Sequence, residues 1–231
     1  MAKIAAKTKR GQKGPAVRVG RPPQELAGEV DERILDAARR AFLERGLAGA
    51  SIEEIARRAR AGKPTIYARF PTKEALFSAV AMRNAAAVRG RIESYEPAGG
   101  TIEERLVSVG TNILERLLDS NVIEFMRLSV AEARRFPELA NVGRIARERA
   151  AEAVAQVLGE VARSDGIGTF AALAPEYLAT TTRFFLDLVV GRLLMRAMFG
   201  ENLKLLRAEI DAHVARSVSF FLAACRQGGI K

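Results

Sequence analysis

The 231-residue sequence predicts an all-α protein. Apolar residues recur with the period of about 3.6 residues that a helix requires through most of the chain beyond residue 28. No segment alternates apolar and polar residues as a half-buried strand would. Ser or Thr precedes several periodic stretches, and Gly or Pro follows them, which marks helix starts and ends. We therefore expect a series of helices joined by short turns.

The first three helices are predicted to form a helix-turn-helix. The first begins near residue 28 and ends at Gly46, because glycine is favoured just past a helix. Ser51-Ile52-Glu53-Glu54 has the pattern of a capping box, with Ser51 as the N-cap and Glu54 reaching back to it, and should start a second, short helix. After the turn Arg60-Ala61-Gly62, a third helix begins at Lys63-Pro64, where proline is tolerated, and it ends before Pro71. This motif places its second helix in the major groove of DNA.

The remaining sequence predicts a larger helical region. Thr72 can cap a fourth helix that runs to about residue 94, and Pro97-Ala98-Gly99-Gly100 indicates a linker. A second capping box, Thr101-Ile102-Glu103-Glu104, begins the next helix. The later helices are expected over 102–119, 122–135, 137–163, 174–199 and 203–226. The predicted division is a flexible basic arm over 1–27, a helix-turn-helix domain over 28–75 and a helical domain over 76–231.

The net charge of +10 is concentrated at the N-terminus. Residues 1–23 carry seven of the cations and no acid, namely Lys3, Lys7, Lys9, Arg10, Lys13, Arg18 and Arg21. Such a segment buries too little apolar surface to order itself, and its charge suits nucleic acid or an anionic membrane surface. Gly20-Arg21-Pro22 resembles the core of an A·T-hook, whose arginine enters a narrow minor groove, although Val19 replaces the usual arginine. A purely electrostatic tail is the alternative.

The composition argues against an enzyme and against a membrane protein. A single histidine and a single cysteine exclude the common His-metal, thiol–histidine and cysteine-cluster sites. We therefore predict no catalytic residue, no metal ligand and no cofactor. No apolar run approaches the roughly 20 residues of a membrane span, and the N-terminus lacks the apolar core of a secretion signal. A cytoplasmic protein is expected.

The helix-turn-helix resembles the DNA-binding domain of the TetR/AcrR family of transcriptional regulators from residue 29 to about 80. Residues 127–139 are also similar to a segment found in many members. The apolar, hydroxyl, turn and aromatic positions of the motif match in one register: Ala41-Phe42, Gly46, Ser51-Ile52, Ile55-Ala56, Ala59, Lys63-Pro64-Thr65-Ile66-Tyr67, Phe70, Lys73-Glu74 and Leu76-Phe77.

The turn departs from the family pattern. The family usually has glycine where Arg60 stands and a small polar cap where Gly62 stands. A residue other than glycine is uncommon at positive φ. Either Arg60 adopts that conformation or the turn is remodelled around Gly62, and the choice decides where Lys63 is aimed.

The candidate DNA contacts carry hydrogen-bond donors around the third helix. Lys63 offers an ammonium, Thr65 a hydroxyl and a methyl that suits thymine, and Arg69 a fork that can bind guanine. Tyr67 fits a phosphate contact, which the resemblance also implies. Ser51 and Lys73 lie at predicted helix N-termini, where the backbone N–H groups already favour an anion. The predicted DNA-binding set is Arg21, Ser51, Lys63, Pro64, Thr65, Tyr67, Arg69 and Lys73. Alternatively, Ser51 is only a helix cap, Tyr67 is a half-buried aromatic, and the arginines at 57, 58 and 60 form a solvated face.

The resemblance implies that the C-terminal region binds an effector and dimerises. A pocket between the middle helices would be lined by Phe125, Met126, Leu128, Phe136 and Tyr177. An intersubunit four-helix bundle would use apolar residues of the last two long helices: Phe184, Phe185, Leu188, Leu193, Met195, Ile210, Val214, Val218, Phe221 and Leu222. The alternative for both sets is internal core.

The sequence thus predicts a sequence-specific DNA-binding transcriptional regulator. Its expected partners are double-stranded operator DNA, a small-molecule effector and a second copy of the chain. A ligand-responsive homodimeric repressor at a palindromic operator is the first hypothesis, and the habit of the family favours repression over activation. The alternative is a helical protein that binds nucleic acid or a membrane surface without sequence preference through its basic arm.

Overall fold

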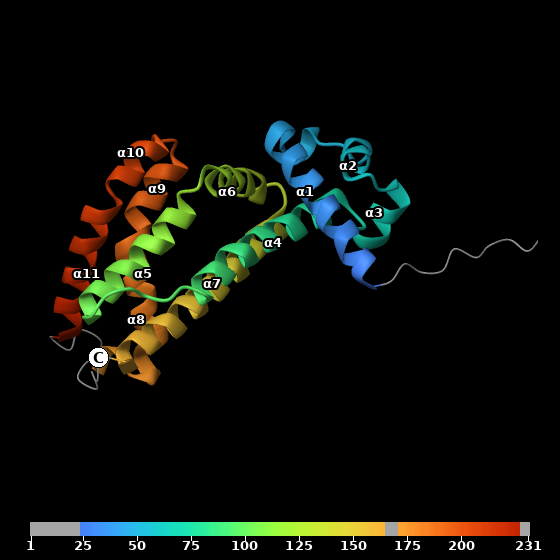
Figure 1. The fold of residues 1–231 in the computed structure, drawn as a ribbon. Coiled ribbons are helices and arrows are strands. Elements are labelled where there is room, and N and C mark those ends of the chain that lie inside the picture. Colours follow the sequence, from blue (N-terminus) through green and yellow to red (C-terminus); the bar gives the residue numbers. More distant parts are fainter. Residues whose placement is uncertain (1–23, 165–170, 227–231) are drawn as a thin grey trace, which may run out of the picture.

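The computed structural model describes residues 24–164 and 171–226, which are helical with no strand (Figure 1). The predicted all-α fold is confirmed. The arm over 1–23, with its candidate Arg21, lies outside the described residues. No helix of the described ranges has the length and apolar character needed to cross a membrane. The helices are α1 (Gln24–Gly49), α2 (Ile52–Ala59), α3 (Lys63–Arg69), α4 (Lys73–Glu93), α5 (Ile102–Leu117), α6 (Ser120–Ala133), α7 (Pro137–Ser164), α8 (Pro175–Leu186), α9 (Arg192–Met198), α10 (Leu203–Ala208) and α11 (Ile210–Arg226).

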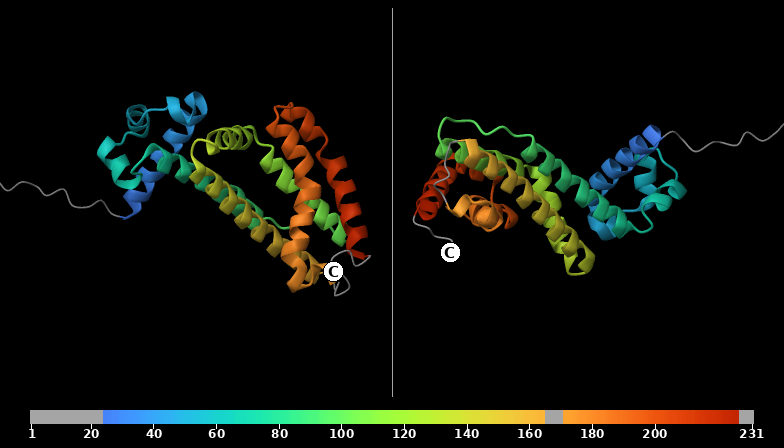
Figure 2. Two further views of the ribbon diagram at one scale, coloured as in Figure 1. Left: turned by 180° about the vertical axis from the view of Figure 1, so that it is seen from behind. Right: turned by 90° about the horizontal axis from the view of Figure 1, so that it is seen from below.

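Helices α1 to α3 form a small head at one end of an elongated molecule. Helix α4 runs from the head toward a larger body, in which α5, α8, α9, α10 and α11 gather at the other end (Figure 1). Helices α4 and α7 lie side by side along the middle of the molecule, as the two further views also show (Figure 2). Helix α6 lies between the head and the body and packs on α7 and α1.

The core of the head extends past the predicted boundary at residue 75. Phe77 of α4 is fully buried and meets the ring of Phe42 edge-on, with centroids 5.1 Å apart. The other face of Phe77 stacks on Phe125 of α6 at 5.0 Å. Leu76 and Val80 of α4 belong to the same cluster. The predicted division between 75 and 76 therefore runs through a single core, because the first turns of α4 pack with the head.

The body has a second core formed by α5, α7, α8, α9 and α11. Phe185 and Phe221 meet edge-on at 5.3 Å. Helix α5 approaches α11 closely at Gly110, where an added Cβ would lie 2.8 Å from Val214. Two helices can approach each other this closely only where one of them lacks a side chain at the contact. Gly110 is thus a packing glycine in the body.

A π-helical turn, Asp187–Gly191, separates α8 from α9 within the predicted helix 174–199. The carbonyl of Leu188 accepts from the Ser217 hydroxyl at 3.1 Å, and the Val189 carbonyl lies 2.9 Å from the His213 ring nitrogen. A π turn holds one more residue than an α turn and shifts the carbonyls from their usual partners. The two polar side chains of α11 therefore bind the displaced carbonyls inside the body.

The two predicted capping boxes differ. At α5, Thr101 accepts from the Glu104 N–H at 3.2 Å, and the Glu104 carboxylate accepts from the Thr101 N–H at 3.1 Å, so this box is confirmed. At α2, Ser51 caps the helix by accepting from the Glu54 N–H at 3.2 Å. The Glu54 carboxylate, however, pairs with Arg58 at 2.6 Å and Arg45 at 3.1 Å. The prediction that Glu54 reaches back was wrong, because two arginines bind its carboxylate.

Candidate DNA-binding surface and effector cavity

The turn between α2 and α3 keeps its left-handed residue. Arg60 has φ 51° and ψ 44°, and it is the single non-glycine residue at positive φ within the described ranges. The Arg60 N–H donates to the Arg57 carbonyl at 3.3 Å and the Ala61 N–H to the Ala56 carbonyl at 3.0 Å. These two bonds form a Schellman motif, which requires one left-handed residue. Of the two alternatives, Arg60 adopts the positive φ, and Gly62 is an ordinary extended N-cap.

Helix α3 turns one face inward and one outward. Ile66 is fully buried in the head, whereas Lys63, Pro64 and Tyr67 are exposed, Tyr67 to 48%. Thr65 is half-buried. Lys63, Pro64 and Tyr67 therefore form the outward face of α3.

Lys63 already has an acidic partner. Its ammonium donates to the Glu53 carboxylate of α2 at 2.9 Å. This hydrogen bond raises the pKa of Lys63 and lowers the pKa of Glu53. Both side chains are more than half exposed, so the pair is open to water and to competing anions. A phosphate or a base edge must compete with Glu53 for the ammonium.

Arg69 lies behind the outward face. Its guanidinium pairs with Asp31 of α1 and donates to the Thr65 carbonyl at 3.3 Å. Its side chain is 27% exposed. These contacts connect the end of α3 to α1, so Arg69 stands at the junction of two helices rather than at the tip of the motif.

Lys73 joins the start of α4 to the connection between α1 and α2. Its ammonium donates to the carbonyls of Ala48 and Ala50, both at 3.0 Å. Ser51 follows immediately at the N-terminus of α2. The structure thus brings Ser51 and Lys73 together beside the head, and one of the three ammonium donors of Lys73 has no bond to these carbonyls.

A cavity of about 230 Å³ lies between α4, α6 and α7. Of the predicted pocket residues, Phe125 and Met126 line it. Leu128 and Phe136 pack against the core of the head, and Tyr177 lies on α8, so none of these three lines this cavity. The sequence did not indicate the remaining lining: Phe77, Ala81, Asn84, Ala85, Val88, Leu117, Val122, Ser129, Val130, Leu139, Val142, Gly143, Ala146, Arg147 and Ala150.

Most residues predicted for the dimer interface form the core of the body. Side chains of this set that are at most 3% exposed are Phe185, Leu193, Ile210, Val214, Val218, Phe221 and Leu222. These seven assignments were wrong, because helical periodicity marks the buried face of a helix and the body itself covers that face. Phe184 and Met195 are each 53% exposed, and Leu188 is half-buried.

The exposed apolar side chains at this end of the molecule include two that were not predicted. Phe199 follows α9 and Phe220 lies on α11, and both are largely exposed. Small exposed residues accompany Phe220 at helical spacing on α11: Ala212, Ala215, Ser219 and Ala223. Unpaired aromatic side chains beside a strip of small residues are typical of a helix face that packs on another protein.

Two family models match the chain. Residues 34–80 match the bacterial regulatory proteins of the tetR family, and residues 104–227 match the C-terminal domain of AefR-like transcriptional repressors. The first match covers α2, α3 and most of α1, and the second covers the body. The uncharacterized HTH-type transcriptional regulator YvkB of Bacillus subtilis (strain 168) is 29% identical over 112 residues, which are 48% of this chain and 57% of that protein.

Solved structures share the whole fold. A TetR-family transcriptional regulator from Mesorhizobium loti is 27% identical, with a TM-score of 0.72, over 86% of this chain and 97% of that chain. The flavonoid-responsive regulator FrrA is 28% identical, with a TM-score of 0.67, over the same shares of the two chains. The similarity thus includes the head, α4 and the body together.

Proposed function

This chain belongs to the TetR family of bacterial regulatory proteins and is a DNA-binding transcriptional regulator, and we propose that it is a repressor that binds a palindromic operator as a homodimer and responds to a small molecule. The predicted family is confirmed. Repression is favoured because the body matches the model of AefR-like transcriptional repressors.

The outward face of α3 supports the proposed DNA contact. We assign Lys63, Pro64 and Tyr67 to the major groove and its walls, with Thr65 behind them. In a helix-turn-helix the N-terminal residues of the second helix reach the base edges, and hydroxyl groups and ammonium groups bind phosphates. Ser51 and Lys73, which lie together where α1, α2 and α4 meet, would bind a neighbouring phosphate. These contacts together would fix the register of the head on DNA.

Arg69 has a different proposed role. Its pairing with Asp31 favours a part in holding α3 against α1 over a direct contact with guanine. A side chain that orients the recognition helix influences affinity for every sequence, whereas a base contact influences one position. The Arg69 proposal is therefore that of a positioning residue.

A second copy of the chain would pack on the exposed residues of α8, α9 and α11. We propose that Phe184, Met195, Phe199 and Phe220 form this face with the small residues of α11. Two heads related by a twofold axis would then face two half-sites of opposite orientation. Replacing Phe220 by Glu should leave the monomer folded, because its side chain is 67% exposed, while the dimer dissociates in sedimentation analysis.

Helix α4 is the proposed connection between effector and DNA. Phe77 and Ala81 of α4 line the cavity, and Phe77 also packs on Phe42 of the head. A ligand that favours one packing of these rings would shift the population of head orientations, and recognition helices at the wrong separation no longer match both half-sites.

Selection of bound fragments from random double-stranded DNA tests the proposal. The full chain should enrich one palindromic sequence. The same selection with Tyr67→Ala and Lys63→Ala together should enrich nothing, while Phe199→Ala should enrich the original site at lower yield. Enrichment of sequences with no common motif by the unmodified chain would sink the operator proposal.

A further inference from the structure

We propose that the effector is an apolar organic acid that binds as its anion, with its charged group on Arg147. This inference rests on the proposed response to a small molecule, and it concerns the chemistry of the cavity between α4, α6 and α7. It follows from the composition of the lining and from the surroundings of Arg147.

The cavity is apolar except at a few points. Among the residues that line it, Asn84, Ser129 and Arg147 carry polar side-chain groups, and none is acidic. The rings of Phe77 and Phe125 form part of the wall, with small and aliphatic side chains around them. Pockets of this kind hold an apolar body and orient it through a few polar contacts. A strongly polar ligand would lose more hydration than this lining could replace.

Arg147 is the one charged residue of the lining; it is exposed at the cavity, and no acid stands at the positions of α7 where a helical ion pair with it would form. The positions three and four residues away, where helical ion pairs form, are Gly143, Arg144, Ala150 and Ala151. Glu148, the nearest acid in sequence, accepts two hydrogen bonds from Arg144, both at 2.7 Å. A guanidinium at an apolar cavity with its neighbouring acid already bound is suited to an incoming carboxylate, which it can grip through two parallel bonds.

Ser129 adds a second constraint on the ligand. Its hydroxyl donates to the Phe125 carbonyl at 2.8 Å, so the oxygen is left to accept a hydrogen bond. Asn84 of α4 can both donate and accept. A ligand with a hydroxyl or amide donor on its apolar body would satisfy Ser129 while its anionic group meets Arg147. The anionic group, rather than this donor, decides the class.

Matched probes separate charge from shape. We would titrate the full chain by calorimetry with a panel of straight-chain alkanoates and phenylalkanoates, each paired with its uncharged primary amide. The carboxylates that fit should bind about tenfold or more tightly than their amides, since a charge-assisted hydrogen bond is roughly twice as strong as a neutral one. If no carboxylate of the panel binds more tightly than its amide, the proposal is wrong.

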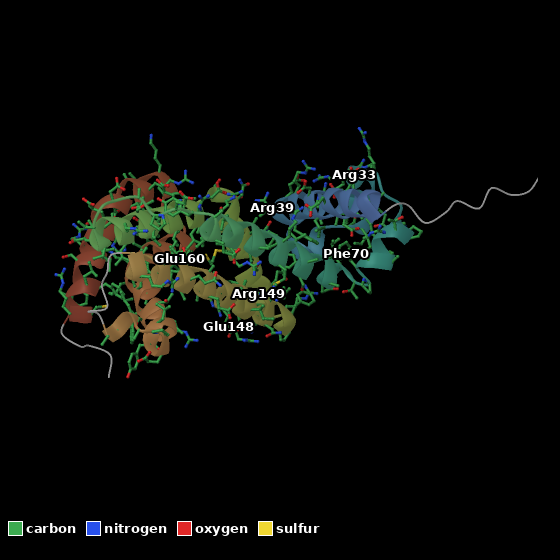
Figure 3. The ribbon with its side chains drawn as sticks, turned by 60° about the horizontal axis from the view of Figure 1, so that its bottom comes forward. Arg33, Arg39, Phe70, Glu148, Arg149 and Glu160 are labelled. Carbon is green, nitrogen blue, oxygen red and sulfur yellow. The ribbon has the colours of Figure 1, made fainter. Side chains whose placement is uncertain are left out.

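Arg149 provides a control on the same helix. It borders a separate and much smaller hollow with Met82 and Arg89, and Figure 3 shows it on α7 next to Glu148. Arg147→Met should abolish the preference for carboxylate over amide and leave amide binding unchanged. Arg149→Met removes the same charge and should leave the preference intact. An equal loss in both variants would show that net charge, not Arg147, selects the anion.

The same experiment distinguishes this inference from the proposed function. Calorimetry on the chain without DNA reports the carboxylate preference even if no operator exists. Conversely, suppose that the chain binds a palindromic site that no carboxylate releases, while calorimetry shows no preference for carboxylates. That result would leave the proposed regulator standing and overturn the assignment of the ligand.

Discussion

The head and the cavity use their cations in opposite ways. In the head, Lys63 is paired with Glu53 and Arg69 with Asp31, so both cations of α3 already have acidic partners. At the cavity, Arg147 has no acid at the helical positions where one would pair with it. The cations of α3 thus take part in pairs that join α3 to α1 and α2, whereas Arg147 is free of such a pair on its own helix, as the proposed ligand contact requires.

Phe77 is where the two regions meet, and its removal should have the largest effect. Phe77→Ala deletes a fully buried ring that packs on both Phe42 and Phe125. We expect a loss of about 3–5 kcal/mol in the free energy of unfolding, as for other buried rings. Urea denaturation followed by circular dichroism measures it. Leu205→Ala, at a side chain of α10 that is 61% exposed and outside the proposed dimer face, should change stability by less than about 0.5 kcal/mol. Similar losses of stability for the two variants would contradict the role of Phe77 in joining the head to the cavity.

Tyr67 tests whether the outward face of α3 meets the DNA backbone. Tyr67→Phe removes one hydroxyl from a side chain that is half exposed, so stability should be unchanged. We expect DNA affinity to fall by about 1 kcal/mol, the net contribution of one hydrogen bond, and to fall equally for operator and unrelated DNA. Fluorescence anisotropy with both duplexes measures the two changes. A loss confined to one base position would reassign Tyr67 to base reading.

The pair between Asp31 and Arg69 tests the proposal that charge positions α3. A double-mutant cycle with Asp31→Asn and Arg69→Met should give a coupling of about 0.5–1 kcal/mol in the free energy of unfolding, as expected for a partly exposed ion pair. DNA affinity should fall to a similar extent in both single variants and for all sequences. If Arg69→Met relaxed one base position while Asp31→Asn had no effect, Arg69 would be a base reader.

The smallest expected effect concerns Glu53. Glu53→Gln releases Lys63 from its ion pair and removes a negative charge from the DNA-facing side of the head. We expect affinity for DNA to rise by about two- to fivefold, with a steeper dependence on salt. Anisotropy titrations at several salt concentrations measure both. Glu44→Gln, which disturbs the pair with Arg58 instead, is the matched control and should leave the salt dependence unchanged.

Local signals predicted the head well. Gly46, at φ 69°, kinks α1, which continues to Gly49 rather than ending at Gly46 as predicted. The Ser51 cap, the turn before Gly62 and Pro64 lie within a few residues of the groups they act on, and they set the boundaries of α2 and α3. The predicted role of Glu54 was wrong because its partners, Arg45 and Arg58, come together only in the folded head. At Thr101 the full box closes, because the Glu104 carboxylate accepts from the backbone N–H groups of Gly100 and Thr101.

The cavity and the dimer face depend on tertiary packing, which a single sequence does not reveal. Periodicity placed Val214 and Val218 on one apolar face of a helix. Only the fold shows that the body covers this face and leaves Phe220 exposed. For Arg147, a signal was present in the sequence, since the positions that could hold a helical partner carry no acid. Its meaning required the cavity that α4 and α6 complete.

Hydroxyl-radical footprinting on the selected operator shows whether two α3 helices of a dimer read two half-sites. We expect two protected segments of inverted sequence on one face of the duplex, with centres about 10 base pairs or a multiple of this apart. The Phe220→Glu variant should lose the symmetric pattern. A single unbroken protected segment that follows no sequence, equally strong with Phe220→Glu, would contradict this expectation.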